Sequence, residues 1–204
     1  LWQTSEIVDD TRLLHVPADL PPGSYHLRVG LYYLDSADNQ ISPISAGSSG
    51  GSDGGVQVVS WRIRPDASGI VTATPANASF AGDVTLRAYA IHPSASSAQV
   101  QTYWIADKQL SQRLVLSVQV LDSSGRLIAQ SDHEPVDGSF PTTSWVPGEI
   151  MLDERSVPLS AAWVATNQII VVMYDRDTQR RLPVVNTQQA GADHFTLQPR
   201  AASP

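Results

Sequence analysis

The chain has 204 residues, of which 42% are hydrophobic and 16% charged, so it carries enough apolar side chains to bury a substantial core. The formal charge of −7 and the pI near 5.0 argue against nucleic acid and anionic membranes as partners, because phosphate binding needs clustered Lys and Arg. The lack of cysteine excludes disulfides, thiolate zinc sites and thiol nucleophiles. With 13 Gly and 14 Pro, the composition favours short strands and frequent turns over long helices.

Alternating apolar and polar residues predict half-buried strands along most of the chain. Residues 25–31, for example, have apolar side chains at the odd positions. The other predicted strands are, in chain order, residues 56–63, 84–91, 100–105 and 114–121. Turn residues separate these runs at a spacing typical of sandwiches. We therefore predict an all-β fold, an antiparallel β-sandwich of the immunoglobulin or jelly-roll kind.

Three connecting segments have distinctive compositions. Residues 45–55 are nearly all Gly and Ser, which predicts a loop without packed structure; no phosphate-binding motif follows it. Residues 121–127 place a polar loop with Gly125 between two alternating runs, which predicts a hairpin. The uncharged residues 156–174 contain Pro158 and several polar residues, so we predict two strands joined by a turn and no transmembrane segment.

The chain contains about one and a half copies of an internal repeat. Trp2 and Glu6 match Trp145 and Glu149, and both pairs are followed by apolar and then acidic residues. Residues 29–32 match residues 171–174, each ending in Tyr. We predict that residues 1–65 are the C-terminal half of a first sandwich, residues 66–75 a linker and residues 76–204 a complete second sandwich.

Half a sandwich exposes apolar strand faces to water unless another structure covers them. We expect this half to dock on the second unit, to pair with another chain or to be poorly ordered, and its missing first half to lie upstream of Leu1. The chain begins with Leu1 and has no signal-peptide pattern, so we expect it to be an excised or processed segment.

A motif in the second copy resembles a known family. Its residues are Ala129-Gln130-Ser131-Asp132, Pro135, Gly138, Pro141-Thr142-Thr143, Trp145, Pro147-Gly148-Glu149, Asp153, Tyr174-Asp175 and Arg181-Leu182. Together they resemble a C-terminal unit of integral-membrane glycosyltransferases from Chloroflexi-like bacteria, which are relatives of dolichyl-phosphate-mannose protein mannosyltransferases. The resemblance implies tandem β-sandwiches on the extracytoplasmic side, tethered to an upstream membrane portion. That portion holds the family's catalytic residues, and none of them matches this chain.

Candidate catalytic and metal-binding groups have simpler explanations as turn residues. Paired carboxylates would be needed for a glycosidase, and the available ones flank turns or strand starts. The cluster Asp132-His133-Glu134 lies on an extended run, where adjacent side chains point to opposite faces. Residues 35–39 and 175–177 are acidic enough for calcium but equally typical of turns. We predict no catalytic residue, no metal site and no cofactor. The carboxylates considered are Asp132, Glu134, Glu149, Asp153 and Glu154.

Sugar binding is the ligand hypothesis that the sequence favours, because sandwich modules can stack sugar rings on exposed aromatic side chains. The candidates are Trp104, Tyr103, Trp145 and Glu149. Trp104 and Tyr103 have opposite parity, so one is expected in the core and the other outward, while Trp145 equally suits a packing role.

These observations leave several functions open. The first hypothesis is a noncatalytic, extracytoplasmic accessory or binding domain of a membrane glycosyltransferase-like protein, with a glycan or lipid-linked sugar as partner. The second is a structural or assembly module that self-associates or docks through its half-repeat. A carbohydrate-binding module of a secreted protein and an independent hydrolase are further alternatives.

Overall fold

The computed structural model describes residues 7–34, 41–44, 55–81, 83–94, 96–159 and 167–198. Within them, regular structure consists of strands and short 3-10 helices. The strands are β1 (Gly23–Val29), β2 (Leu31–Leu34), β3 (Ile41–Ile44), β4 (Val56–Ile63), β5 (Thr74–Phe80), β6 (Val84–Pro93), β7 (Ser97–Ala106), β8 (Leu114–Leu121), β9 (Leu127–His133), β10 (Met151–Pro158), β11 (Gln168–Asp175) and β12 (Phe195–Leu197). The 3-10 helices are η2 (Ser68–Val71), η3 (Val136–Gly138) and η4 (Thr142–Ser144).

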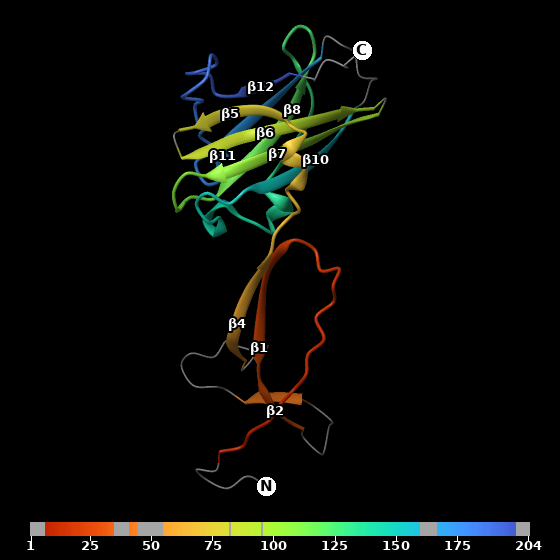
Figure 1. Cartoon of the computed structure of the whole chain (residues 1–204), viewed down its shortest axis with the longest axis vertical. Helices are drawn as coiled ribbons and strands as arrows, with labels where there is room; N and C mark the ends of the chain where they lie inside the picture. The colour runs from red at the N-terminus through yellow and green to blue at the C-terminus, as the bar shows by residue number, and fades with distance from the viewer. Residues whose placement is uncertain are drawn as a thin grey trace.

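Two four-stranded sheets form a sandwich from β5 to β12. Their strand orders are β10-β7-β6-β5 and β12-β11-β8-β9, and every neighbouring pair is antiparallel. Figure 1 shows the sandwich as the yellow to blue upper part of the molecule. The predicted all-β fold, an antiparallel sandwich, is confirmed.

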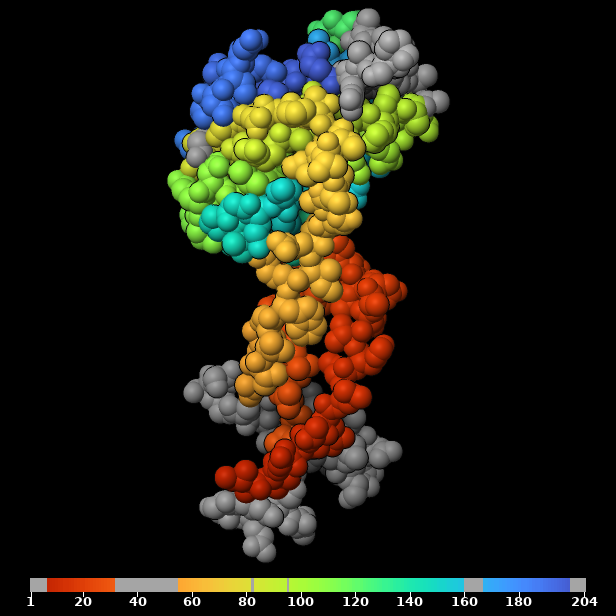
Figure 2. Space-filling view, in the orientation of Figure 1, coloured from red at the N-terminus to blue at the C-terminus, as the bar shows by residue number. Residues whose placement is uncertain are grey.

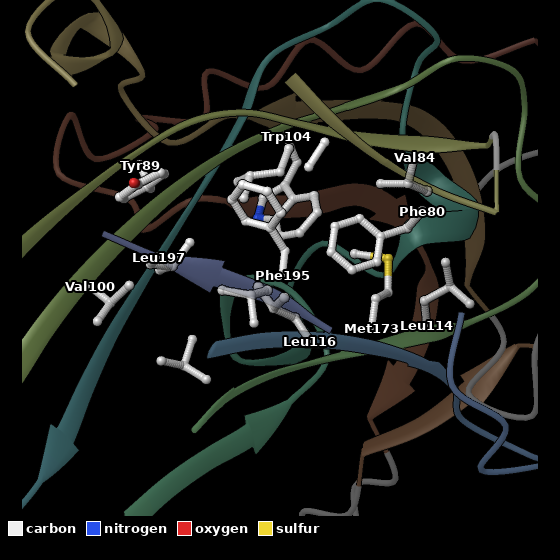
Figure 3. Close-up of a cluster of buried hydrophobic side chains, with 14 of the residues drawn as sticks. Phe80, Val84, Tyr89, Val100, Trp104, Leu114, Leu116, Met173, Phe195 and Leu197 are labelled. Atoms are coloured by element: carbon white, nitrogen blue, oxygen red, sulfur yellow. The ribbon is translucent and has the colours of Figure 1, made fainter. Parts of the chain in front are cut away.

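The core lies between the sheets and follows from the alternation of apolar residues. Leu114, Leu116, Val118 and Val120 on β8 all point inward, as the period of two requires. Figure 3 shows this interior, in which the Trp104 ring packs against Phe80 at a centroid distance of 5.5 Å. Each such fully buried large side chain contributes about 1.5–3 kcal/mol to folding, which makes this cluster the main source of stability.

The strand predictions agree with the structure in most places. Residues 56–63 and 114–121 are β4 and β8, and the predicted hairpin pairs Leu121 with Leu127. Its loop is closed by the Asp122 carboxylate, which accepts hydrogen bonds from the backbone N–H groups of Ser124 and Arg126. Gly125 supplies the positive φ of 78° that this loop needs.

Residues 156–174 contain the two predicted strands, the end of β10 and most of β11, which belong to opposite sheets, so the chain passes from one sheet to the other between them. Residues 160–166, where the predicted turn falls, lie outside the described residues. The Gly/Ser segment 45–54 and the acidic segment 35–39 lie outside the described residues.

The N-terminal region, residues 7–63, stands apart from the sandwich. Strand β1 pairs with β4, and β2 pairs with β3, in two separate two-stranded ribbons. Figures 1 and 2 show this region as a narrower red to orange extension below the sandwich. Tyr25 and Trp61, which are cross-strand neighbours, stack at 5.9 Å.

The predicted linker packs against the sandwich. Its residues Ala67, Ile70 and Ala73 lie on a buried cluster formed by Ala88, Tyr103 and Leu152 on the outer face of one sheet. This contact gives the connection between the two regions a fixed place on the sandwich surface.

Candidate functional site

The three aromatic residues singled out for sugar stacking are buried. Trp104 is fully enclosed between the sheets, and Trp145 donates a hydrogen bond from Nε1 to the Phe140 carbonyl oxygen at 3.0 Å. Both rings therefore serve as packing elements, with no face open to a ligand.

Tyr103 is on the outer face of its sheet, opposite in direction to Trp104 as the parity predicted. It is nevertheless only 1% exposed, because η2 and its flanking residues cover the ring. Burial, with smaller contributions from the charges of Glu154 and Asp66, raises the pKa of Tyr103 above its ordinary value. The expectation that the outward ring is accessible is thus wrong, since sequence parity does not reveal what covers a sheet.

Glu149 lies where β4 meets the sandwich. Its Oε1 is 3.2 Å from Nη1 of Arg64, and its Oε2 is 3.6 Å from Nη1 of Arg62. The Arg62 guanidinium also lies over the Phe140 ring, 5.1 Å from its centroid. A hollow of about 770 Å³ opens beside these groups. Because both arginines face the same carboxylate, the arrangement joins the N-terminal region to the sandwich.

A buried ion pair joins the two sheets at their edges. Arg155 on β10 donates from Nε to Oδ2 of Asp153 at 2.6 Å, and both side chains are essentially inaccessible. Arg155 also donates to the carbonyl oxygens of Ser131 and His133 on β9, and Oδ1 of Asp153 accepts from the Val136 N–H. Each buried charge is therefore neutralised and hydrogen-bonded, which is the condition under which burial is tolerated.

The remaining candidate carboxylates, with the exception of Asp132, are held by neighbouring groups. Glu134 receives two hydrogen bonds from Arg113, and Glu154 accepts one from Gln101. Asp175 accepts the N–H groups of its own turn, and the Thr178 backbone bond is the largest cause of its lowered pKa. In the part of the chain that the structure describes, no group of three or more His, Asp or Glu side chains is placed to hold a metal ion.

A group of polar side chains without a role in the contacts above lies on the outer face of the sheet β12-β11-β8-β9. They surround a shallow hollow of about 230 Å³, here called the polar hollow. The hollow is lined by Gln119 on β8, Gln130 and Asp132 on β9, Val172 and Tyr174 on β11, and Gln179 and Arg181 on the following loop. Strand pairing builds it, because Gln119 lies opposite Gln130, and Tyr174 is bridged to Arg181.

Two side chains of the polar hollow are available to a ligand. Gln119, Gln179 and Arg181 already interact with Ser117, the Arg176 carbonyl and Asp193. The side chains of Gln130 and Asp132, by contrast, are exposed and make no hydrogen bond within the described residues. Burial, followed by the nearby charge of Asp132, raises the pKa of Tyr174, so its hydroxyl stays protonated at neutral pH.

The sequence contains a signal for this site outside its aromatic residues. The hairpin at residues 121–127 fixes the register of β8 and β9, so it places the two outward glutamines side by side. The contributions of Tyr174 and Arg181 depend on the pairing of β11 with β8, two strands that are distant in the chain. No short-range pattern reports that pairing.

Comparisons with known proteins yield only distant structural likenesses. No protein-family model and no curated protein matches the sequence. A β-glucuronidase from glycoside hydrolase family 2 superposes with a TM-score of 0.35 and 14% identity, over 55% of this chain and 11% of that chain. The Bacteroides uniformis β-glucuronidase gives the same TM-score and identity, over 53% of this chain and 14% of its own. The chain thus spans a small fraction of the length of either enzyme.

None of the helical segments in the described ranges is long and apolar enough to cross a membrane.

Proposed function

We propose that the sandwich is a noncatalytic module that binds a carbohydrate in the polar hollow. The observation that carries the proposal is the ring of amides, carboxylate, phenol and guanidinium around Val172 on one rigid sheet face. Sugar hydroxyls both donate and accept hydrogen bonds, and side chains of these types can satisfy both roles. A site built on strands also keeps its groups in place better than one built on loops.

The size of the polar hollow favours a single sugar ring. Its volume of about 230 Å³ is below the range of about 300–1,000 Å³ typical of pockets for drug-sized ligands. The partly exposed ring of Tyr174 offers one apolar surface, while Gln130 and Asp132 on the edge strand remain free to bind hydroxyls. We therefore assign the hollow to a terminal sugar residue of a glycan or of a lipid-linked sugar.

The proposal also includes the role of the sandwich within a larger protein. The motif between Ala129 and Leu182 supports an accessory, extracytoplasmic role in a membrane glycosyltransferase-like protein, with catalysis performed elsewhere in that protein. Four residues of the polar hollow, Gln130, Asp132, Tyr174 and Arg181, lie within this motif.

A binding experiment with matched variants tests the sugar site. The full chain is screened on a glycan array, and hits are titrated by calorimetry. The variant Gln130→Ala/Asp132→Asn should weaken binding about fivefold or more, because each hydrogen bond to a ligand contributes about 0.5–1.5 kcal/mol. The control Gln99→Ala/Glu154→Gln also changes one exposed amide and one exposed carboxylate, on the opposite sheet, and should leave binding unchanged.

Two results would contradict the proposal. One is a flat response to every glycan on the array. The other is sugar binding that both double variants weaken equally, which would place the ligand outside the polar hollow.

A further inference from the structure

An ion pair in the N-terminal region copies the buried pair of the sandwich. Asp10 and Arg12 each lie 143 positions before Asp153 and Arg155, the same spacing that separates Trp2 from Trp145. Arg12 donates from Nε to Asp10 at 2.9 Å, as Arg155 does to Asp153 at 2.6 Å. The first pair, however, is open to solvent, with side chains 84% and 57% exposed, and Arg12 has no further partner among the described residues.

The residues that surround this pair have the inward pattern of β10. In β10, Met151, Asp153, Arg155 and Val157 point into the sandwich. At the same spacing, Val8 and Leu14 flank Asp10 and Arg12, but they are 41% and 61% exposed, whereas Met151 and Val157 are 1% and 0% exposed. Figure 1 shows this segment as the red trace that runs beside the β1–β4 ribbon without joining a sheet.

The ribbon itself repeats a strand pair of the sandwich. Strand β11 pairs antiparallel with β12. Its match in the repeat covers the end of β1 and the start of β2, and β1 pairs antiparallel with β4. Val29 and Leu31, which match Val171 and Met173, are 55% and 52% exposed, although both of their counterparts are completely buried. In the sandwich, the other edge of β11 is occupied by β8. The corresponding edge of β1 has no strand beside it among the described residues.

We propose that the N-terminal region is an acceptor for a separate half-sandwich that has the strand alternation of β5–β9. A β7-like strand would pair with residues 8–15, and a β8-like strand would pair with the open edge of β1. Arg12 would then donate to the edge carbonyls of a β9-like strand, as Arg155 does to Ser131 and His133. Closing the sandwich would bury Val8, Leu14, Val29 and Leu31 together.

The partner assignment depends on this correspondence. In the sandwich, the arginine of such a pair donates to the edge strand of the second sheet. Arg12 is held by an aspartate two residues away and lies between exposed apolar residues, so a sheet edge suits it as a partner better than a flat protein surface does. The chain's own β5–β9 cannot fill the role, since β7, β8 and β9 are already occupied by β10 and β11 and by Arg155. The acceptor therefore requires a second half-unit with the same alternation.

A fusion protein tests the proposal with the second unit as a probe. Residues 76–143 are joined directly in front of Leu1 of the full chain, so that Leu1 follows residue 143 as Ser144 does in the second unit. Hydrogen exchange is then measured by mass spectrometry. Residues 8–15 and 23–29 should exchange at least about tenfold more slowly than in the chain without the fusion, because ladder hydrogen bonds protect amides. Residues 151–158 should stay as protected as before.

A matched fusion isolates the role of the ion pair. The fusion carrying Asp10→Ser/Arg12→Ser should lose most of the protection gained by residues 8–15. A control fusion carrying Arg176→Ser/Asp177→Ser, which changes the same residue types on an exposed loop of the second unit, should keep it.

Three outcomes would overturn the proposal. The first is equally fast exchange of residues 8–15 and 23–29 with and without the added half. The second is a loss of protection at residues 151–158, which would mean that the added half displaces the chain's own strands. The third is a concentration-dependent dimer of the unfused chain that protects residues 8–15 and 23–29, which would assign the acceptor to a second copy.

Discussion

The sequence Asp-x-Arg forms the same ion pair twice in this chain, in opposite surroundings. In the sandwich, Asp153 and Arg155 are sealed between two sheet edges and bonded to the backbone of β9. In the N-terminal region, Asp10 and Arg12 contact each other in water. The contact of two nearby residues is thus locally encoded, whereas its energetic weight depends on the strands that enclose it.

The apolar residues of the two regions differ in the same way. Both regions contain period-two strands, but the sandwich stacks two four-stranded sheets while the N-terminal region has only isolated two-stranded ribbons. A two-stranded ribbon by itself is marginally stable in water, because it cannot bury one of its faces. We therefore expect the stability of the chain to reside in β5–β12.

The largest expected effect is the difference in unfolding free energy between the Arg155 and Arg12 variants. Arg155→Ala should lower the free energy of unfolding by about 3–5 kcal/mol, because it leaves Asp153 buried without a counter-charge. Arg12→Ala should leave the transition unchanged, since its pair is solvated. Urea unfolding followed by tryptophan fluorescence measures both. Equal losses would contradict the contrast between the regions.

The next effect concerns the connection between the regions. A Cβ at Gly69 would lie 2.5 Å from the Tyr103 hydroxyl oxygen, so Gly69→Ala should destabilise the sandwich by about 1–3 kcal/mol through overpacking. Adding Tyr103→Phe removes that oxygen and should restore most of the loss. Thermal unfolding of the single and double variants measures the coupling. No loss in Gly69→Ala would show that η2 does not stay on the sheet.

A smaller effect is expected where the regions meet. Glu149→Gln removes the charge that faces Arg62 and Arg64. These pairs lie at the surface and are only partly buried, and surface ion pairs contribute about 0.2–1 kcal/mol, so the sandwich should keep most of its stability while the end of β4 becomes more mobile. NMR relaxation of the residue 62–64 amides, with Glu154→Gln as the control, measures this. Unchanged relaxation would indicate that other contacts hold the junction.

The smallest effect is a pH dependence in the β8–β9 hairpin. Hydrogen bonds from Ser124 and Arg126 lower the pKa of Asp122 from 3.8 to about 2. A lowered folded-state pKa stabilises the fold above pH 3.8, and this contribution is lost as pH falls toward 2. The difference in melting temperature between the protein and Asp122→Asn should therefore shrink between pH 4 and pH 2. A pH-independent difference would contradict the assigned role of the carboxylate.

The strands and the hairpin were predictable because they depend on neighbours in the chain. Alternation located β4 and β8 at their observed bounds, and the polar loop with Gly125 located the turn between β8 and β9. The same local information explains Asp122 and Asp175, whose carboxylates bind the backbone of their own turns. The two Asp-x-Arg sequences were also visible, although the likeness of the Asp10–Arg12 contact to the buried pair became evident only beside Arg155.

The candidate site was predicted less well, for a physical reason. Side-chain parity correctly placed Trp104 and Tyr103 on opposite faces, but the cover over Tyr103 comes from residues 67–73, which lie far from it in sequence. The polar hollow combines β8, β9 and β11 with the loop after β11, and β8 and β11 meet only after the chain crosses between sheets.

Local order in this chain follows from short-range chemistry: the alternation of side chains, the turn residues and the two copies of Asp-x-Arg. The tertiary structure alone decided which aromatic rings were covered, which polar groups met on one face and which of the two ion pairs lost contact with water. Burial and long-range strand pairing depend on the packing of distant segments, and a linear pattern contains no record of which segments meet.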